Sequence, residues 1–484
     1  MYIAPVVDSR PHAAAPAPLA AGALPLPVVG ADLSVPLVTG EQVGYVNLDY
    51  AASAPCLRSV LDAVAALLPW YSSVHRGAGF ASTVTTELYA AARQAVGDFV
   101  GARADDTVVF TRNTTDALNL LAAALPEDTT VVTFASEHHA NQLPWRRGRS
   151  VVLPVPASAD EAIARADDAL RGAPSRHRLL AVTGASNVTG ELWPLSELAA
   201  VAHRRGARLS VDAAQLAPHR AIEMAAIGAD YLALSGHKLY APFGGGVLVG
   251  RGDWLDAARP YLAGGGAVRR VTLDGVEWAS GAPRHEAGTP NVVGAVSLAA
   301  ACRALAEVGM SAVAAHEAGL LDRVTRGLGA VPGVERLEMW GPASPRIGVV
   351  TFQVRGFHPG VVAAALSAEH GIGVRDGSFC AHPLMSALAG ARAPEAPGGA
   401  AVPGAVRVSF GVGTSRADID RFLGAISDLV ARGPRARYRL DAGRYVPEPD
   451  PRPRPALAGL LAGGTAGAAF GLLAGQLAPC QSPV

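Results

Sequence analysis

Cysteine is scarce in this chain. Only four occur among 484 residues, at Cys56, Cys302, Cys380 and Cys480. They are scattered without the close spacing of metal ligands or of a disulfide framework. We therefore expect a reduced, cytoplasmic protein and predict no metal site.

Net charge is also missing, because 41 Lys and Arg residues balance 41 Asp and Glu residues. A balanced chain shows no electrostatic footprint for nucleic acid, so we predict no nucleic-acid partner. The N-terminus has no uninterrupted apolar run, since Pro5, Pro11, Pro16 and Pro18 break it, which argues against a signal peptide. We predict that residues 1–42 form a flexible Ala- and Pro-rich extension and that ordered structure begins near Tyr45.

The most informative stretch that is present runs from Ser210 to Arg251. Its pattern is typical of a buried strand ending at Asp212, a short apolar-periodic segment, and a second strand, YLALS, before Ser-Gly-His-Lys. Parallel strands end on the same edge of a sheet, so we expect Asp212 beside Lys238 in a ligand-binding crevice. Such a pair suits pyridoxal phosphate, with the lysine as Schiff base and the carboxylate on the pyridine nitrogen. From these two residues alone, a structural aspartate and a surface lysine remain the alternative.

The motifs VDAAQ and SGHKLYAPFGGG resemble the cofactor-lysine segment of the class V aminotransferase family, in its cysteine desulfurase and selenocysteine lyase branch. The resemblance implies an enzyme that uses pyridoxal phosphate. It also implies an α/β, aspartate aminotransferase-like fold, with a large doubly wound mixed-sheet domain and a smaller α+β domain. It places Asp212 on the pyridine nitrogen, Gln215 on the ring hydroxyl, Ser235 and His237 on the phosphate, and Lys238 as the Schiff-base lysine.

Further motifs add candidates for binding the cofactor. Thr114 and Thr115 open a predicted helix, whose unpaired N–H groups and positive dipole end suit a phosphate, although simple N-capping by their hydroxyls is common. The resemblance favours phosphate binding by both threonines. It also implies that His138 is a catalytic residue stacked on the cofactor ring. Asn187 is expected to bind the ring and to lie beside the substrate. No third ligand at metal spacing accompanies His138 and His139.

Candidate catalytic and substrate-binding residues lie near the C-terminal end of the region that resembles this family. Cys380, in VRDGSFCAHP, could be a thiolate nucleophile, although a lone cysteine is more often inert. It falls where desulfurases of this branch carry the thiol that takes sulfur from the substrate, while Ser378 and Phe379 stand where many relatives have histidines. A guanidinium suits an amino acid's carboxylate. The family places its substrate arginine at the position of Arg407, and Arg375 is expected to assist.

Two more candidates come from other loops. His75, in VHRG, matches an entrance motif in which the family places a histidine near the substrate. Thr289, in EAGTPN, matches a threonine that reaches the cofactor phosphate of the neighbouring subunit. The resemblance therefore implies a homodimer with shared active sites.

The domain boundaries follow from these motifs. We predict a large domain over 43–305, whose first residues could join the small domain, then the small domain over 306–432 and a linker and tail over 433–484. The insertion at 389–404 is either a lid or an excursion. The uncharged Ala/Gly/Leu segment at 456–477 is long enough to span a bilayer, but its glycines favour a flexible or dimer-packing tail over a membrane anchor.

The expected activity is cysteine desulfuration, which would leave alanine and a persulfide on Cys380, with a protein as a further sulfur acceptor. Aminotransferases, epimerases and C–S lyases of secondary metabolism share the scaffold. An enzyme acting on another amino acid, with Cys380 a bystander, is therefore the alternative. A third reading is a cofactor-binding scaffold without catalysis, which the intact set of Lys238, Asp212, His138 and Arg407 argues against.

Overall fold

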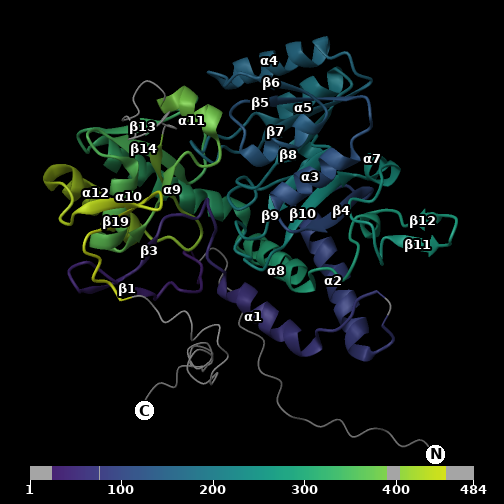
Figure 1. The fold of residues 1–484 in the computed structure, drawn as a ribbon, viewed down its shortest axis with the longest axis horizontal. Helices are drawn as coiled ribbons and strands as arrows, with labels where there is room; N and C mark the ends of the chain where they lie inside the picture. The colour runs from purple at the N-terminus through teal and green to yellow at the C-terminus, as the bar shows by residue number, and fades with distance from the viewer. Residues whose placement is uncertain (1–23, 76, 390–403, 454–484) are drawn as a thin grey trace, which may run out of the picture.

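A seven-stranded mixed sheet forms the centre of the large domain (Figure 1). The computed structural model describes residues 24–75, 77–389 and 404–453. The strand order is β4-β10-β9-β8-β7-β5-β6, in which β10 runs antiparallel to both of its neighbours and all other pairs are parallel. The strands are β4 (Asp106–Thr111), β5 (Thr129–Phe134), β6 (Arg149–Leu153), β7 (His177–Thr183), β8 (Arg208–Asp212), β9 (Tyr231–Ser235) and β10 (Gly246–Arg251).

Helices cover both faces of this sheet, because successive side chains of each buried strand point to opposite sides. In β9, Leu232 and Leu234 join one hydrophobic cluster, while Tyr231 and Ala233 join another. The first cluster includes residues of α1 (Arg58–Leu67), α4 (Ala159–Gly172), α5 (Leu195–Arg204), α6 (Met224–Ile227) and α8 (Val292–Val308). The second includes residues of α3 (Thr114–Ala124) and α7 (Gly252–Ala257). The predicted doubly wound α/β fold is confirmed.

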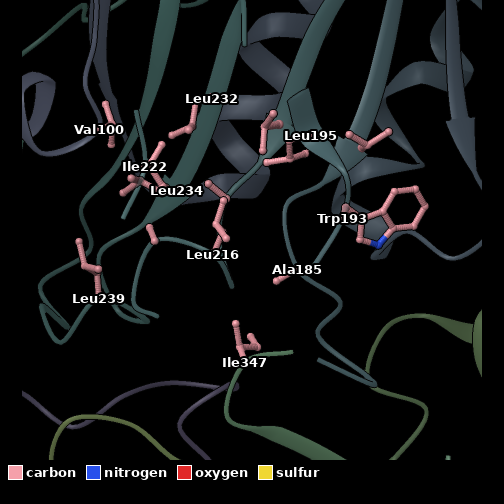
Figure 2. Packing of buried hydrophobic residues seen from close by; sticks show 14 of the residues in the cluster. Val100, Ala185, Trp193, Leu195, Leu216, Ile222, Leu232, Leu234, Leu239 and Ile347 are labelled. Atoms are coloured by element: carbon pink, nitrogen blue, oxygen red, sulfur yellow. The ribbon is translucent and has the colours of Figure 1, made fainter. Parts of the chain in front are cut away.

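The small domain is built on a four-stranded sheet of order β13-β14-β17-β16, with all neighbours antiparallel. Its core is a separate hydrophobic cluster that α9, α10 and α12 share with the sheet. Ile347, just before β14, joins the large-domain cluster instead and faces Ala185 and Leu216 (Figure 2). The elements are α9 (Met310–Gly329), β13 (Val334–Leu337), β14 (Val349–Val354), α10 (Pro359–His370), β15 (Ile372–Gly373), β16 (Arg375–Gly377), α11 (His382–Ala389), β17 (Ala405–Ser409) and α12 (Arg416–Arg432).

Ordered structure begins earlier than the sequence analysis predicts. Leu26 and Val28 are buried, and β1 (Ser34–Pro36) pairs with β2 (Gln42–Gly44), so the expectation of order from Tyr45 onward is wrong for residues 24–44. The apolar side chains of this Pro-rich segment pack on distant parts of the chain, which local periodicity cannot show. Next, β3 (Val46–Asn47) pairs in parallel with β15, so this segment lies against the small domain.

The segment after α12 also differs from the predicted linker. There, β18 (Tyr438–Asp441) and β19 (Arg444–Pro447) form a hairpin, and Tyr438 donates its hydroxyl to the buried Glu369 of α10. Most of the predicted 389–404 insertion and the whole 456–477 segment lie outside the described residues.

The remaining elements also belong to the large domain. The hairpin of β11 and β12 projects from it (Figure 1). The remaining elements are α2 (Phe80–Phe99), β11 (Val268–Val271) and β12 (Val276–Trp278). Short 3-10 turns lie at η1 (Leu68–Trp70), η2 (His139–Asn141), η3 (Pro144–Arg147) and η4 (Ala282–Arg284). Within the described ranges no single helix has both the length and the apolarity to cross a membrane; α8 and α9 pass only as a pair bent by 79°.

Candidate active site

The carboxyl ends of the parallel strands open onto a cavity of about 260 Å³. Asp212 is the last residue of β8 and pairs with Ala233 of β9, and Lys238 follows the end of β9 by three residues. The residues predicted to bind cofactor or substrate line this cavity, except for His75 and Thr289. These lining residues are Thr114, Thr115, His138, Asn187, Asp212, Gln215, Ser235, His237, Lys238, Arg375, Cys380 and Arg407.

Lys238 is half-buried and lines the cavity. Burial lowers the pKa of this amine from 10.5 to about 8, while the nearby Asp212 carboxylate acts in the opposite direction. The turn before it is tight: a Cβ added at Gly236 would lie 2.8 Å from the Gly245 carbonyl oxygen. The lysine is therefore held on a compact backbone with an amine that is partly neutral near pH 8.

The cavity floor carries two buried acceptors. Asp212 accepts a 3.0 Å hydrogen bond from the Ala214 N–H, and burial raises the pKa of its carboxyl. Gln215 donates its side-chain amide to the Ala51 carbonyl at 2.7 Å. The Oε1 of Gln215 is buried and finds no hydrogen-bond partner among the described residues. Because an orphaned buried acceptor is costly, this atom is suited to a ligand donor.

At one end of the cavity, hydroxyl groups gather around the N-terminus of α3. The Thr114 N–H and hydroxyl both lie 2.7 Å from the Ser235 Oγ. The alternative of simple N-capping by the threonine hydroxyls does not apply, because Asn113 is the N-cap and its side chain accepts a hydrogen bond from the Asp116 N–H. Thr114 and Thr115 both line the cavity at the start of the helix. Hydroxyls at a helix N-terminus form a favourable site for an anion.

His138 lies on the cavity wall after β5. Burial, with help from Lys238, lowers the pKa of its imidazole to about 3. Its Nδ1 accepts a 3.0 Å hydrogen bond from the Ala140 N–H, so the neutral ring carries its proton on Nε2. The wall thus presents a flat, uncharged imidazole. His237, by contrast, has its Nδ1 3.3 Å from the Ser53 hydroxyl, and burial lowers its pKa to about 4.

The small domain contributes a buried guanidinium. Arg407 on β17 donates to the Asn187 carbonyl at 3.0 Å and to Asp49 at 3.1 Å. Its Nε is buried and finds no hydrogen-bond partner in the described part of the chain. Arg375 is more exposed and lies 3.9 Å from the other oxygen of Asp49. The unpartnered Nε leaves donor capacity for a carboxylate.

Cys380 lies across the cavity on the loop between β16 and α11, and it is exposed. Both Phe379 and Cys380 have left-handed backbone, with φ of 52° and 54°. Two hydrogen bonds hold their carbonyls, from the Asn187 side chain to Phe379 at 2.8 Å and from the His139 N–H to Cys380 at 2.8 Å. The thiol is thus carried on a strained backbone tied to the cavity wall.

Two predicted residues lie elsewhere in this chain. The His75 N–H donates to the Thr86 hydroxyl, and its ring meets Tyr89 edge-on at 5.9 Å. Thr289 lines a different cavity, to which Tyr89 also contributes. Neither residue lies on the cavity that holds Lys238.

Sequence reasoning missed two carboxylates. Asp49, in the YVNLDYAASAP segment, bridges Arg407 and Arg375. Glu137 directly precedes His138 and is fully buried, and it accepts from the Asn141 amide at 2.8 Å and from the Thr183 N–H at 3.1 Å. An acidic residue beside a candidate histidine was the available signal for Glu137, whereas the pairing of Asp49 with Arg407 required the fold.

A lysine and an aspartate at the carboxyl edge of a mixed sheet, facing an arginine from a smaller domain, define an α/β enzyme of two domains. A family model described as aminotransferase class-V matches residues 46–422. The chain belongs to this family.

Similar proteins carry a more specific description. The chain is 36% identical to a cysteine desulfurase of Dickeya dadantii, over 80% of this chain and 92% of that protein. Among solved structures, it resembles the apo cysteine desulfurase from Thermococcus onnurineus, with a TM-score of 0.72 and 34% identity. It also resembles the cysteine desulfurase CsdA from Escherichia coli, with a TM-score of 0.69 and 31% identity. Each match covers 80% of this chain and 95% of the solved chain.

Metal binding has no support from the described side chains. Within residues 24–75, 77–389 and 404–453, no group of three or more His, Cys, Asp or Glu residues is placed to hold a metal ion.

Proposed function

We propose that this protein is a cysteine desulfurase that uses pyridoxal phosphate. The observation that carries the proposal is that Cys380, Lys238 and Arg407 line one cavity. A thiol, an amine of lowered pKa and a guanidinium with a spare donor are the groups that removal of sulfur from an amino acid needs. The names of the relatives and of the solved structures support the same activity.

The residues present fit the cofactor. The lone acceptor on Gln215, the hydroxyls of Thr114 and Ser235 at the start of α3, and the flat neutral ring of His138 suit a phosphorylated hydroxypyridine. Lys238 would attach it, and Asp212 would hold its ring nitrogen. When bound, pyridoxal phosphate supplies an electron sink for the substrate's Cα.

The chain's own groups would then perform the transfer. Arg407, assisted by Arg375, binds the carboxylate, and Lys238 moves a proton at Cα because its pKa is close to working pH. The Cys380 thiolate attacks the substrate sulfur, so the Cβ–S bond breaks as an S–S bond forms. Cβ takes up a proton, leaving alanine and a persulfide on Cys380. An external thiol or an acceptor protein would take the sulfur next.

A second copy of the chain would complete the site. Thr289 lies away from the cavity of its own chain, and the same holds for His75. We propose that the protein is a homodimer in which Thr289 reaches the cofactor phosphate of the partner. Mass measurement in solution and weakened cofactor binding in Thr289→Ala would support this assembly, whereas a monomer with full activity would exclude it.

The decisive experiment measures alanine and sulfide released from L-cysteine by the cofactor-loaded protein with a thiol reductant present. We expect equal yields of the two products and their loss in Cys380→Ser. The matched control is Cys56→Ser, because Cys56 is a half-buried free cysteine outside the cavity and its loss should leave both yields intact. If no alanine forms although other amino acids change the cofactor spectrum, the protein is instead an aminotransferase or lyase with another substrate.

A further inference from the structure

Phe379 packs against Arg407 and directly precedes Cys380 in the loop that lines the cavity. Its ring lies under the Arg407 guanidinium, with the guanidinium carbon 5.0 Å from the ring centroid. The side chain is only 7% exposed, so this contact is largely removed from water. A guanidinium over an aromatic face is attracted by the ring's negative quadrupole, more strongly when both are desolvated.

Hydrogen bonds close this contact into a ring of three residues. The Asn187 side-chain amide donates to the Phe379 carbonyl at 2.8 Å, and Arg407 donates to the Asn187 carbonyl at 3.0 Å. Arg407, Asn187 and Phe379 therefore fix one another through three separate contacts. A shift of the guanidinium would weaken its contact with the Phe379 ring or its hydrogen bond to Asn187.

The next peptide belongs to Cys380. Because Phe379 and Cys380 both have left-handed backbone, the loop keeps this shape only while its surroundings hold it. Two hydrogen bonds from the large domain hold it: the Asn187 amide donates to the Phe379 carbonyl, and the His139 N–H donates to the Cys380 carbonyl. Asn187 thus holds both the peptide that precedes the thiol and the Arg407 guanidinium, through its side chain and its carbonyl respectively.

We propose that Phe379 is a positioning residue that fixes Arg407, as the site of the substrate carboxylate, and the Cys380 thiol in one arrangement. The inference rests on the proposed function to the extent that Arg407 takes an amino acid's carboxylate. The ring supplies the contact to Arg407 and the backbone supplies the link to the thiol. Substitutions that remove the aromatic face should therefore affect carboxylate binding and thiol reactivity together.

The test compares Phe379→Leu, which keeps an apolar side chain without an aromatic face, with Phe379→Tyr, which keeps the face. Binding of L-alanine to the cofactor-loaded protein is followed by the cofactor spectrum and by thermal shift. L-alanine carries the carboxylate but no sulfur, so the measurement does not depend on desulfuration. We expect the dissociation constant to rise about 2- to 30-fold in Phe379→Leu and to stay near the wild-type value in Phe379→Tyr.

Thiol reactivity gives a second readout. The rate at which iodoacetamide labels Cys380, followed by mass spectrometry of its peptide, should differ from wild type in Phe379→Leu and match it in Phe379→Tyr. Melting temperatures and cofactor content show that both variants are folded. An unchanged L-alanine affinity in Phe379→Leu, or equal weakening in both variants, would overturn the inference.

The outcome is separable from that of the proposed function. If the wild-type protein binds L-alanine but forms no alanine from L-cysteine, the desulfurase proposal is wrong. The two Phe379 variants would still test the inference in that case. Wild-type protein that binds no L-alanine would remove the premise that Arg407 holds a carboxylate, and the inference would fall.

Discussion

The carboxylate of Asp49 lies 3.1 Å from Nη2 of Arg407, although the two residues are 358 positions apart in the chain. Asp49 follows β3 at the start of the fold, and Arg407 lies on β17 near its end. Burial lowers the pKa of Arg407, and Asp49 opposes that effect, so the aspartate is the counter-charge of the buried guanidinium. A substrate carboxylate at Arg407 would sit near this negative charge.

Asp49→Asn should therefore separate stability from ligand binding. Without ligand, the variant should lose about 1–3 kcal/mol of unfolding free energy, because a charge-assisted hydrogen bond becomes a neutral one. L-alanine should bind a few times more tightly, because repulsion between two carboxylates is removed. Denaturant unfolding with and without L-alanine measures both effects.

Asp274→Asn is a suitable control, because this exposed residue lies between β11 and β12, outside the cavity that Arg407 lines, and the substitution makes the same change of charge. If Asp49→Asn loses stability but binds L-alanine as the control does, then Asp49 acts only as a structural partner of Arg407.

The lowered pKa of Lys238 predicts how cofactor capture depends on pH. The amine reacts only when neutral, and its pKa of about 8 is below the usual 10.5, so capture of pyridoxal phosphate by the apoprotein should rise with pH to a midpoint near 8. The Asp212 charge raises this pKa, so Asp212→Asn should shift the midpoint to lower pH. Borohydride trapping followed by mass spectrometry measures capture. Lys238→Arg keeps the positive charge and should trap nothing, and a midpoint near 10 in the wild type would contradict the prediction.

Glu137 should make stability depend on pH. Burial, and to a lesser extent Asp212, raises the pKa of its carboxyl from 4.5 to about 8, so the folded protein keeps a proton that the unfolded chain releases. The stabilising contribution is present below pH 4.5 and is lost as pH rises toward 8, by at most about 1.4 kcal/mol per pH unit. Glu137→Gln is neutral at every pH and should flatten this part of the curve.

Glu137→Ala serves as the matched comparison. It removes the titrating carboxyl and also the acceptor for the Thr183 N–H and the Asn141 amide, so its curve should be as flat as that of Glu137→Gln and lie roughly 1–3 kcal/mol below it at all pH values. Chemical denaturation at pH 5.5, 7 and 8 distinguishes the variants. Parallel curves for wild type and Glu137→Gln would show that Glu137 is already ionised in the folded protein.

Local sequence was enough to predict the centre of the site. Asp212 and Lys238 could be placed together because β8 and β9 are adjacent parallel strands, whose ends must meet on one edge. The start of α3 and the positions of the buried strands could likewise be predicted from short-range sequence patterns.

The rest depends on contacts between distant parts of the chain. The packing of residues 24–44, the pairing of Asp49 with Arg407 and the contact of Arg407 with Phe379 join segments that no periodicity connects. The N-cap was missed for a different reason, because Asn113 and the threonines after it are all good capping residues and only the backbone geometry decides among them.

Close packing behind the end of the cavity that we propose to bind phosphate gives the last prediction. A Cβ added at Gly246 would lie 2.5 Å from Cα and 2.7 Å from N of Asn113, the residue that caps α3. Backbone cannot give way as a flexible side chain can, so Gly246→Ala must displace the start of α3 and with it the Thr114 contact to Ser235. We expect a loss of about 1–3 kcal/mol in stability and weaker binding of pyridoxal phosphate.

Gly148→Ala is the control, because its backbone is extended and an added Cβ there meets no described atom within 4 Å. Comparing the affinities for pyridoxal phosphate and for pyridoxal then shows how much the phosphate group contributes to binding. Displacement of α3 should weaken binding of the phosphorylated ligand and leave binding of pyridoxal nearly unchanged. Equal weakening of both ligands would mean that Gly246 supports the cavity as a whole rather than the helix start, and the anion site would have to be sought on other residues.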